Sequence, residues 1–114
     1  MAIKNRQLGA LITTLKRVAI EKQRPLWKRV ASDLEKPSRQ RRTVNLWKLD
    51  REAKDGETVI VPGKVLGDGE LTKTFTVAAF AYSTEAKKKL DKHALTIDEL
   101  LKKQPDGKGI RIIG

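Results

Sequence analysis

The stretch KTFTVAAFAY, residues 73–82, alternates threonine with apolar residues and becomes apolar on both faces from Val77 onward. This pattern is typical of a central strand in a sheet that is covered on both sides. Ser83 is the predicted N-cap of a helix that continues to about Lys92, and Ile110–Ile113 is a predicted closing strand. Strand, helix and strand in this order predict parallel pairing with a right-handed connection.

Turn residues divide the region before this strand into short pieces. Thr58–Val61 is a β-branched run, and we expect Pro62-Gly63 to end it as a turn. Lys64–Leu66 follows, and Gly67-Asp68-Gly69 predicts a tight reversal of the chain. Short strands joined by turns are therefore expected here.

Three amphipathic segments precede the strands. The first predicts a helix over residues 5–22. A second helix begins at Pro25 and ends at Lys36, because a residue before proline is biased away from the helical conformation. Asn45 is the predicted N-cap of a third, short helix. The expected inward residues are Leu8, Leu11, Ile12, Leu15, Val18 and Ala19 in the first helix, Trp27, Val30, Ala31 and Leu34 in the second, and Leu46, Leu49 and Ala53 in the third.

Together these patterns predict an α/β fold, with N-terminal helices followed by a small sheet with helical crossovers. Thr96 and Glu99 form a predicted capping box for a last short helix. A chain of 114 residues has the size of one domain, 1–114, in which 1–55 is a basic helical part and 56–114 a small α/β part.

The positive charge is unevenly distributed. Residues 1–51 hold 14 Lys and Arg against 4 Asp and Glu, whereas residues 52–114 hold 11 against 10, so the first half carries +10 of the net +11. Eight of the nine arginines lie in the first half, Arg111 being the exception. Because the planar guanidinium fits phosphate oxygens better than an ammonium does, this asymmetry indicates a polyphosphate partner.

A basic run with no carboxylate, KPSRQRR at residues 36–42, stands where the second helix ends. We expect it to be an extended, flexible segment whose arginines contact phosphate, although most short charge runs are only solvated. The candidate nucleic-acid-binding residues are Lys28, Arg29, Lys36, Arg39, Arg41, Arg42, Trp47, Lys48 and Arg51.

Two further features can be interpreted in more than one way. Trp47 lies off the inward stripe of its helix, beside arginines, where it could stack on a base or equally shield its own helix. Trp27 shares a face with apolar residues and is expected in the core. Lys87-Lys88-Lys89 is a second basic run, and a solvated helix face is favoured for it because Glu85 and Asp91 lie nearby.

Nothing in the sequence favours an enzyme. His93, the single histidine, follows a lysine-rich helix without an obvious catalytic partner. The segment GKVLGDGE, residues 63–70, lacks the glycine spacing of phosphate-binding loops, so its glycines are predicted to serve turns. The absence of cysteine excludes disulfides and Cys-based zinc sites and fits the cytoplasm. No cofactor, metal or small-molecule substrate is expected. Membrane association is not expected either, since neither a signal peptide nor a spanning segment is predicted.

The stretch VNLWKLDREAKDGETVIVPGKVLGDGELTKTFTVAAFAYSTEAKKKL, residues 44–90, resembles the large-subunit ribosomal protein family called eighteen-e, of archaea and eukaryotes. The flanking LEKPSRQRRTVNL and LTIDELLKKQPDGKGIRIIG fit the same family, and KVLGDGELTKTFTVAA is similar to the C-terminal half of bacterial-type large-subunit protein fifteen. The short length resembles that of archaeal members. Trp47 is bulkier than the residue expected at that place in the family.

The resemblance implies a non-enzymatic structural constituent of the large ribosomal subunit, with large-subunit ribosomal RNA and neighbouring ribosomal proteins as its partners. It also implies a fold of irregular strand-strand-helix turns with helices at the N-terminal side. We expect a monomer outside the ribosome. An architectural DNA-binding protein is the alternative, which predicts a dimer interface or minor-groove wedge residues that cannot be identified in the sequence. A nuclease or RNA-modifying enzyme ranks third.

Overall fold

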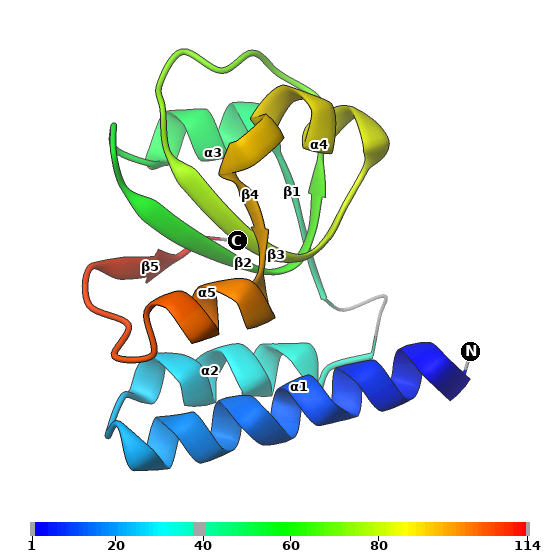
Figure 1. Ribbon diagram of the computed structural model, residues 1–114. Helices are drawn as coiled ribbons and strands as arrows, with labels where there is room; N and C mark the ends of the chain where they lie inside the picture. Colours follow the sequence, from blue (N-terminus) through cyan, green and yellow to red (C-terminus); the bar gives the residue numbers. More distant parts are fainter. Residues whose placement is uncertain (1, 38–40, 114) are drawn as a thin grey trace.

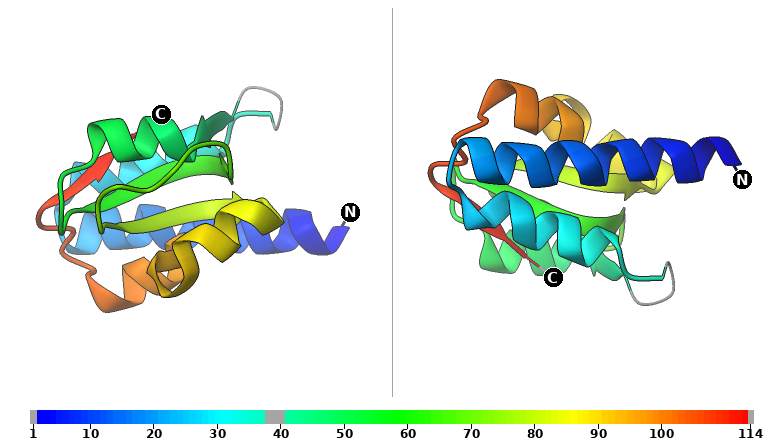
Figure 2. Two further views of the ribbon diagram at one scale, coloured as in Figure 1. Left: turned by 90° about the horizontal axis from the view of Figure 1, so that it is seen from above. Right: turned by 90° about the horizontal axis from the view of Figure 1, so that it is seen from below.

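The protein is built from a five-stranded sheet with helices packed on both of its faces (Figure 1). The structure is a computed structural model that describes residues 2–37 and 41–113, with side chains described from Leu8 onward. The helices α1 (Ala2–Glu21), α2 (Pro25–Leu34) and α5 (Ile97–Lys103) cover one face of the sheet. The opposite face is covered by α3 (Leu46–Glu52) and α4 (Thr84–Leu90), as the two views of Figure 2 also show. The α/β class predicted from the sequence is therefore confirmed.

The pairings within the sheet are parallel. Its strands are β1 (Arg42–Asn45), β2 (Thr58–Leu66), β3 (Thr76–Tyr82), β4 (Ala94–Thr96) and β5 (Ile110–Ile112). They run in the order β1-β2-β3-β4, and β5 also pairs with β2. Both β1 and β5 pair with β2 on the side away from β3: β1 contacts Gly63–Leu66, whereas β5 contacts Thr58–Ile60. Two short strands thus share one edge of the longest strand.

Each face of the sheet has its own hydrophobic core, because alternate side chains of a strand point to opposite faces. In β2, Val59 and Val61 join the core beneath α3 and α4, whereas Ile60 joins the core beneath α1, α2 and α5. In β3, Val77 and Ala78 divide in the same way. Residues 73–82 therefore do contain a strand covered on both sides, as expected.

The helix signals in the sequence are largely confirmed. The inward residues predicted for α2 and α3 are buried, and those of α1 are buried or partly buried in the core. The Ser83 hydroxyl accepts a hydrogen bond from the Ala86 N–H, and Thr96 and Glu99 form the predicted capping box. Asn45 occupies the N-cap position of α3, but its side chain makes no cap hydrogen bond. Among the described helices, none has both the length and the apolar character needed to cross a membrane.

The predicted turn at Pro62-Gly63 is wrong, since both residues are buried within β2. The strand continues past them, with a shift in its pairing to β3 between Val61 and Lys64. A Cβ added to Gly63 would lie 1.9 Å from the Arg42 carbonyl oxygen. The glycine is therefore needed for the close approach of β1 and not for a turn.

Gly67-Asp68-Gly69 does not reverse the chain into a hairpin, because β2 and β3 are parallel. These residues begin the loop that returns to the start of β3. Gly69 has a φ of +115°, and a Cβ there would meet the backbone of Trp47 at 2.5 Å. A Cβ on Gly67 would lie 2.8 Å from the Ala86 backbone nitrogen in α4. The two glycines thus allow the loop to approach α4 and α3 closely, which corrects the turn prediction.

Two strands are absent from the sequence prediction. Of the β1 residues, Arg42 was expected in the flexible basic segment and Asn45 at the start of a helix, and β4 was expected to be a connection after α4. The latter helix ends at Leu90 and is followed by a 3-10 turn, η2 (Asp91–His93). Both strands are short, with four and three residues, and parallel pairing to a longer neighbour defines them.

Candidate nucleic-acid interface

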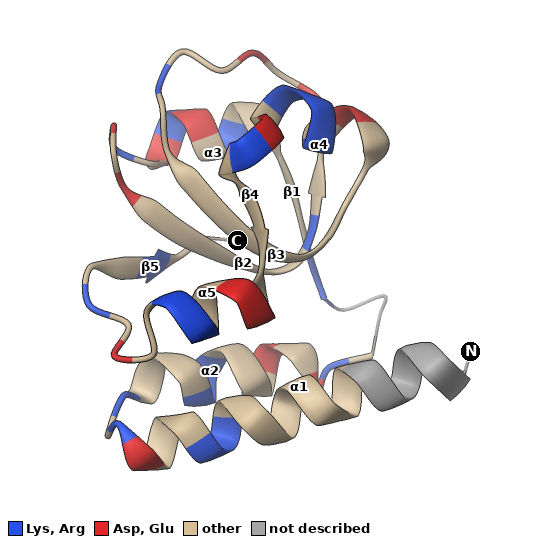
Figure 3. Ribbon diagram, in the orientation of Figure 1, with Lys and Arg blue, Asp and Glu red and all other residues tan. Residues whose placement is uncertain are grey.

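The sheet separates the residues predicted to bind nucleic acid. Lys28 and Arg29 are exposed on α2, whereas Trp47, Lys48 and Arg51 belong to α3 on the opposite face. Figure 3 shows Lys and Arg on α3 and α4 on one side and around the α1–α2 connection on the other. Arg39 lies outside the described residues. The nine candidates therefore do not form one patch.

Asp33 organises the connection between α2 and β1. It is the buried charged residue among those described, with a relative exposure of 7%. One carboxylate oxygen lies 3.2 Å from Lys36 Nζ, and the other lies 3.7 Å from Arg42 Nε. Two predicted phosphate contacts thus share one carboxylate, and Arg42 lies in a strand and not on a flexible segment, which corrects that expectation.

Arg41 is held against the sheet by two contacts. Its guanidinium carbon lies 5.5 Å from the centre of the Phe80 ring, within the range of a cation–π interaction, and its Nε donates to the Lys36 carbonyl oxygen at 3.0 Å. An open hollow of about 230 Å³ lies beside this pair and is also lined by Arg42 and Lys64. We call Arg41, Arg42, Lys64 and Phe80 the strand-edge site.

Lys64 was not identified as a candidate from the sequence. It is exposed although the residues on either side of it in β2 are buried. A lysine that interrupts a β-branched run could have suggested an open place on the sheet. The predicted turn at Pro62-Gly63 concealed this signal, because it placed Lys64 after a break in the strand.

Trp47 lies off the core stripe of α3, as the sequence indicated, and its side chain is 46% exposed. The guanidinium carbon of Arg51 lies 5.2 Å from the centre of the indole ring. Arg51 also contacts the Glu52 carboxylate at 3.4 Å, and Lys48 is half-buried one residue beyond the tryptophan. We call Trp47, Lys48 and Arg51 the Trp47 surface.

The loop at Gly67-Asp68-Gly69 lies between α3 and α4, at the carboxyl ends of β1 and β2. The Trp47 N–H donates to the Asp68 carbonyl oxygen at 3.0 Å. From the other side, Lys89 Nζ donates to the carbonyl oxygens of Gly67 and Gly69 at 2.9 and 3.0 Å. The loop is thereby fixed between the start of α3 and the end of α4.

Lys89 therefore departs from the prediction of a solvated lysine run. All three lysines are exposed residues, but the Lys89 side chain is only 30% exposed and its ammonium is bonded to the two carbonyl oxygens. The helical position of Lys89, three residues after the buried Ala86, could have indicated a side chain at the edge of the core. The long aliphatic stem of lysine allows its ammonium to reach backbone carbonyls from there.

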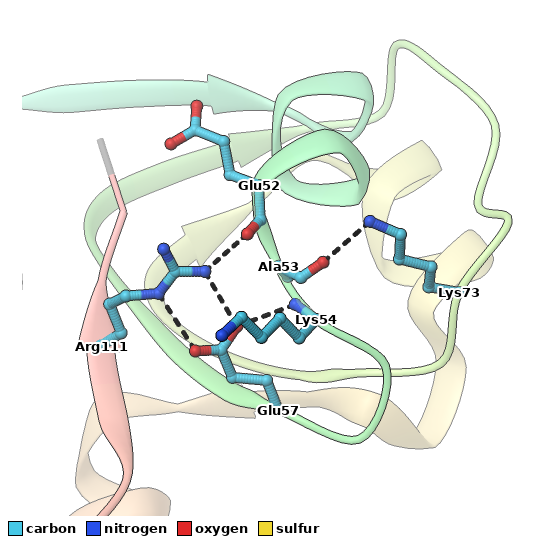
Figure 4. Close-up of polar contacts among 6 residues, drawn as sticks. All are labelled: Glu52, Ala53, Lys54, Glu57, Lys73 and Arg111. Atoms are coloured by element: carbon cyan, nitrogen blue, oxygen red, sulfur yellow. Dashed lines mark hydrogen bonds and ion pairs between the residues drawn. The ribbon is translucent and has the colours of Figure 1, made fainter.

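Arg111, the one arginine of the second half, is bound within the fold (Figure 4). It donates to both oxygens of Glu57, at 3.0 and 2.9 Å, and to the Glu52 carbonyl oxygen at 2.5 Å. The hydrogen bonds from Arg111, and to a smaller extent the one from the Lys54 N–H, hold the pKa of Glu57 below its ordinary value. Lys73 Nζ bonds the Ala53 carbonyl nearby. This network joins β5 to the α3–β2 connection.

A second carboxylate organises the loop that precedes β3. Asp50 accepts hydrogen bonds from the Thr72 hydroxyl at 2.7 Å and from the N–H groups of Thr72 and Lys73 at 2.8 and 3.1 Å. These bonds lower the pKa of Asp50, and the bond from the Thr72 hydroxyl has the largest effect. Because the Lys73 N–H is bonded to Asp50 and the Thr74 N–H to Asp55, neither is free to pair in the sheet, and β3 begins at Thr76 and not at Lys73.

The single histidine belongs to neither of the two sites defined above. His93 is half-buried and borders a hollow of about 260 Å³ together with Lys73, Lys89 and mainly apolar residues. Within residues 2–37 and 41–113, no three His, Asp or Glu side chains are grouped so that they could hold a metal ion. The charged groups that are fixed in place instead bond loops and strand ends.

Comparison with known proteins identifies the family. A family model that describes the ribosomal proteins 50S-L15 and 50S-L18e, together with a 60S counterpart, matches residues 24–94. The chain is 47% identical over 117 residues to "Large ribosomal subunit protein eL18" of Methanopyrus kandleri, covering 96% of this chain and 92% of that protein. The proteins of the same name from Methanoregula boonei and Haloarcula marismortui are 42% and 41% identical.

The alignment with the Methanoregula boonei protein covers 96% of this chain and 93% of its relative, and that with the Haloarcula marismortui protein covers 99% of both. These archaeal relatives confirm the resemblance of residues 44–90 and their flanking stretches to the eighteen-e family. Residues 24–94, which the family model matches, include α2, the sheet up to the start of β4, the strand-edge site and the Trp47 surface. The chain therefore belongs to the ribosomal protein family that includes 50S-L15, 50S-L18e and their 60S counterpart.

Proposed function

We propose that this protein is a structural constituent of the large ribosomal subunit that binds ribosomal RNA through the strand-edge site and the Trp47 surface. The observation that carries the proposal is its identity of more than 40% with large-subunit proteins over nearly its whole length. The relatives compared above are named as ribosomal proteins, and nothing among them supports the DNA-binding alternative. Its expected location is the ribosome, in the cytoplasm.

The two sites share one chemical arrangement, an arginine whose plane is held by an aromatic ring. An arginine side chain loses about 2 kcal/mol of rotamer freedom when it is fixed. Because the rings of Phe80 and Trp47 already restrict Arg41 and Arg51, less of this cost remains when a phosphate binds. Arginines held in this way suit a folded RNA, whose recognition depends largely on backbone shape.

The aromatic rings themselves favour RNA with unpaired nucleotides. Base stacking on an aromatic side chain contributes about 1–3 kcal/mol, and the exposed indole of Trp47 offers such a surface. The helix α4 covers the same face of the sheet as α3, and its exposed Lys87 and Lys88 add positive charge on that side. The Trp47 surface would therefore hold a loop or bulge, and the strand-edge site a phosphate backbone.

A salt titration tests this assignment. We compare the triple variant Arg41→Ala, Lys64→Ala, Arg51→Ala with a control of equal charge, Lys102→Ala, Lys103→Ala, Lys108→Ala, which lies in and after α5. Binding to a large-subunit RNA fragment weakens with salt in proportion to the number of phosphates neutralised. The first variant should reduce the log–log slope by about two to three, and the control should change it less. Equal slopes would contradict the two-site proposal.

A further inference from the structure

An open groove lies where α1 meets α2, away from both proposed RNA sites. Its volume is about 640 Å³, and its apolar part is formed by Ala19, Ile20 and Pro25. Ile20 is 79% exposed, more than any other large hydrophobic residue among those described. An isoleucine exposed to this extent leaves apolar surface in water that a partner could cover.

Cations surround this apolar surface. Lys16, Arg24 and Lys28 line the same groove. Lys16 is paired with Glu35 at 2.9 Å, but none of the ion pairs among the described residues involves Arg24 or Lys28. A ligand that fits the groove must therefore bring both an apolar group and negative charge.

The groove is already shaped by the backbone. The connection between the helices is closed by hydrogen bonds from Lys22 N to Val18 O at 2.8 Å and from Arg24 N to Ala19 O at 3.0 Å. Pro25 then fixes the first turn of α2. A partner would thus meet a surface that needs little ordering upon binding.

The chemistry of the groove favours a protein segment over RNA. The described residues that line it include no aromatic ring on which a base could stack, in contrast to Phe80 and Trp47 at the proposed RNA sites. Its aliphatic floor suits an aliphatic side chain. We propose that the groove docks a segment of a neighbouring ribosomal protein, with an apolar side chain seated against Ile20 and carboxylates beside Arg24 and Lys28.

The inference rests on the place of the protein in the large subunit, but not on which of its surfaces binds RNA. Its test compares Ile20→Gln, which removes apolar surface without changing charge, with the conservative variant Ile20→Leu. Each protein is titrated against large subunits depleted of this protein and, separately, against deproteinised large-subunit RNA. Thermal unfolding of both variants should match the wild type, because the side chain is exposed.

We expect Ile20→Gln to weaken binding to depleted subunits by about tenfold or more, the factor that corresponds to burial of an isoleucine side chain. Its affinity for RNA should equal that of the wild type, and Ile20→Leu should bind both as the wild type does. Unchanged binding to depleted subunits, or equal losses on subunits and RNA, would overturn the docking proposal. A different result would contradict only the RNA function. In that case the wild type would bind depleted subunits but not RNA, and Ile20→Gln would still bind the subunits more weakly.

A photoreactive benzoylphenylalanine placed at position 20 identifies the occupant. In reassembled subunits it should cross-link to a protein segment that carries Asp or Glu beside the attached residue. A cross-link to RNA would overturn the proposal.

Discussion

Trp27 and Trp47 belong to helices on opposite faces of one sheet, and their surroundings differ. Trp27 is fully buried between α1, α2 and the sheet, and its indole N–H donates to the Pro105 carbonyl oxygen at 2.7 Å. Trp47 is nearly half exposed and lies under the guanidinium of Arg51. The first tryptophan has its polar and apolar groups satisfied within the fold, whereas the second leaves both available to a partner.

The other aromatic residues extend this difference. Phe75 is buried, and the Tyr82 hydroxyl lies 2.6 Å from the Leu95 carbonyl oxygen, where burial raises the pKa of the phenol. Phe80, partly buried, carries Arg41. Trp27, Phe75 and Tyr82 thus pack in the cores, Trp47 carries an arginine at the surface, and Phe80 does both. The arginines follow the same division, because Arg111 is bound to Glu57 while Arg41 and Arg51 lie against rings at the surface.

The largest expected effect comes from truncating the buried ring. Trp27→Ala should lower the free energy of unfolding by about 3–5 kcal/mol, because a large core side chain and its hydrogen bond are lost. Trp47→Ala should lower it by less than about 1 kcal/mol, as for most surface substitutions. Chemical denaturation of the two variants measures both values. Equal losses in the two variants would contradict the assignment of Trp27 to the core and Trp47 to the surface.

The second effect concerns the close approach of β1 to β2. Gly63→Ala should cost about 1–3 kcal/mol of stability, since the added methyl group overlaps the Arg42 carbonyl. Gly9→Ala is the matched control, because its Cβ meets no atom within 4 Å and lies in a helix, where alanine is favoured by about 1 kcal/mol over glycine. Thermal melts should therefore move in opposite directions. A neutral Gly63→Ala would show that β1 can separate from β2 without cost.

The third effect concerns binding and not folding. Trp47→Ala should weaken binding to a large-subunit RNA fragment by at least about 1 kcal/mol if a base stacks on the indole. Trp47→Phe retains a ring for stacking and should recover part of the affinity. If both variants bind RNA as tightly as the wild type, the indole shields α3 and does not contact RNA.

The smallest effect is the pH dependence of the Glu57–Arg111 pair. The folded-state pKa of Glu57 is lowered, so its stabilising contribution is complete above its unfolded value of 4.5 and is lost as the pH falls through the folded pKa. The wild type should therefore exceed Glu57→Gln in unfolding free energy at about pH 6, and this difference should shrink toward about pH 3. If the difference in unfolding free energy between the two proteins did not change with pH, the Glu57 carboxylate would not stabilise the fold through its bonds to Arg111.

Much of the fold could be predicted from patterns of local origin. The apolar stripes of α1, α2 and α3, the hydroxyl caps at Ser83 and Thr96 and the buried strand β3 depend on neighbouring residues alone. The strands β1 and β4 could not be predicted, because each owes its conformation to pairing with a distant strand. The same reason explains the error at Pro62-Gly63, where propensity indicates a turn. The strand continues there because Gly63 pairs with Arg42 of β1 and the pairing to β3 resumes at Lys64.

The candidate site was less predictable than the fold. Charge asymmetry and the basic run led to Arg41, Trp47 and Arg51, but the pairing of each arginine with a ring depends on three-dimensional contacts. Arg41 meets Phe80 across the sheet, a contact that no sequence spacing indicates. Lys64 and Lys89 were missed or assigned to solvent because their environment is set by strands and loops distant in the sequence.

The shared edge of β2 has a consequence for the order of folding. The half of that edge bonded by β1 can form early, since its partner precedes it closely in the chain, whereas Thr58–Ile60 must wait for Ile110–Ile112. Contacts between residues so far apart in sequence form slowly because a long loop must close first. Until then β2 presents unpaired N–H and C=O groups, which are a template for pairing with a wrong strand. Arg111, which bonds the α3–β2 connection from within β5, thus completes the sheet and ends the interval in which the nascent domain is open to misassembly.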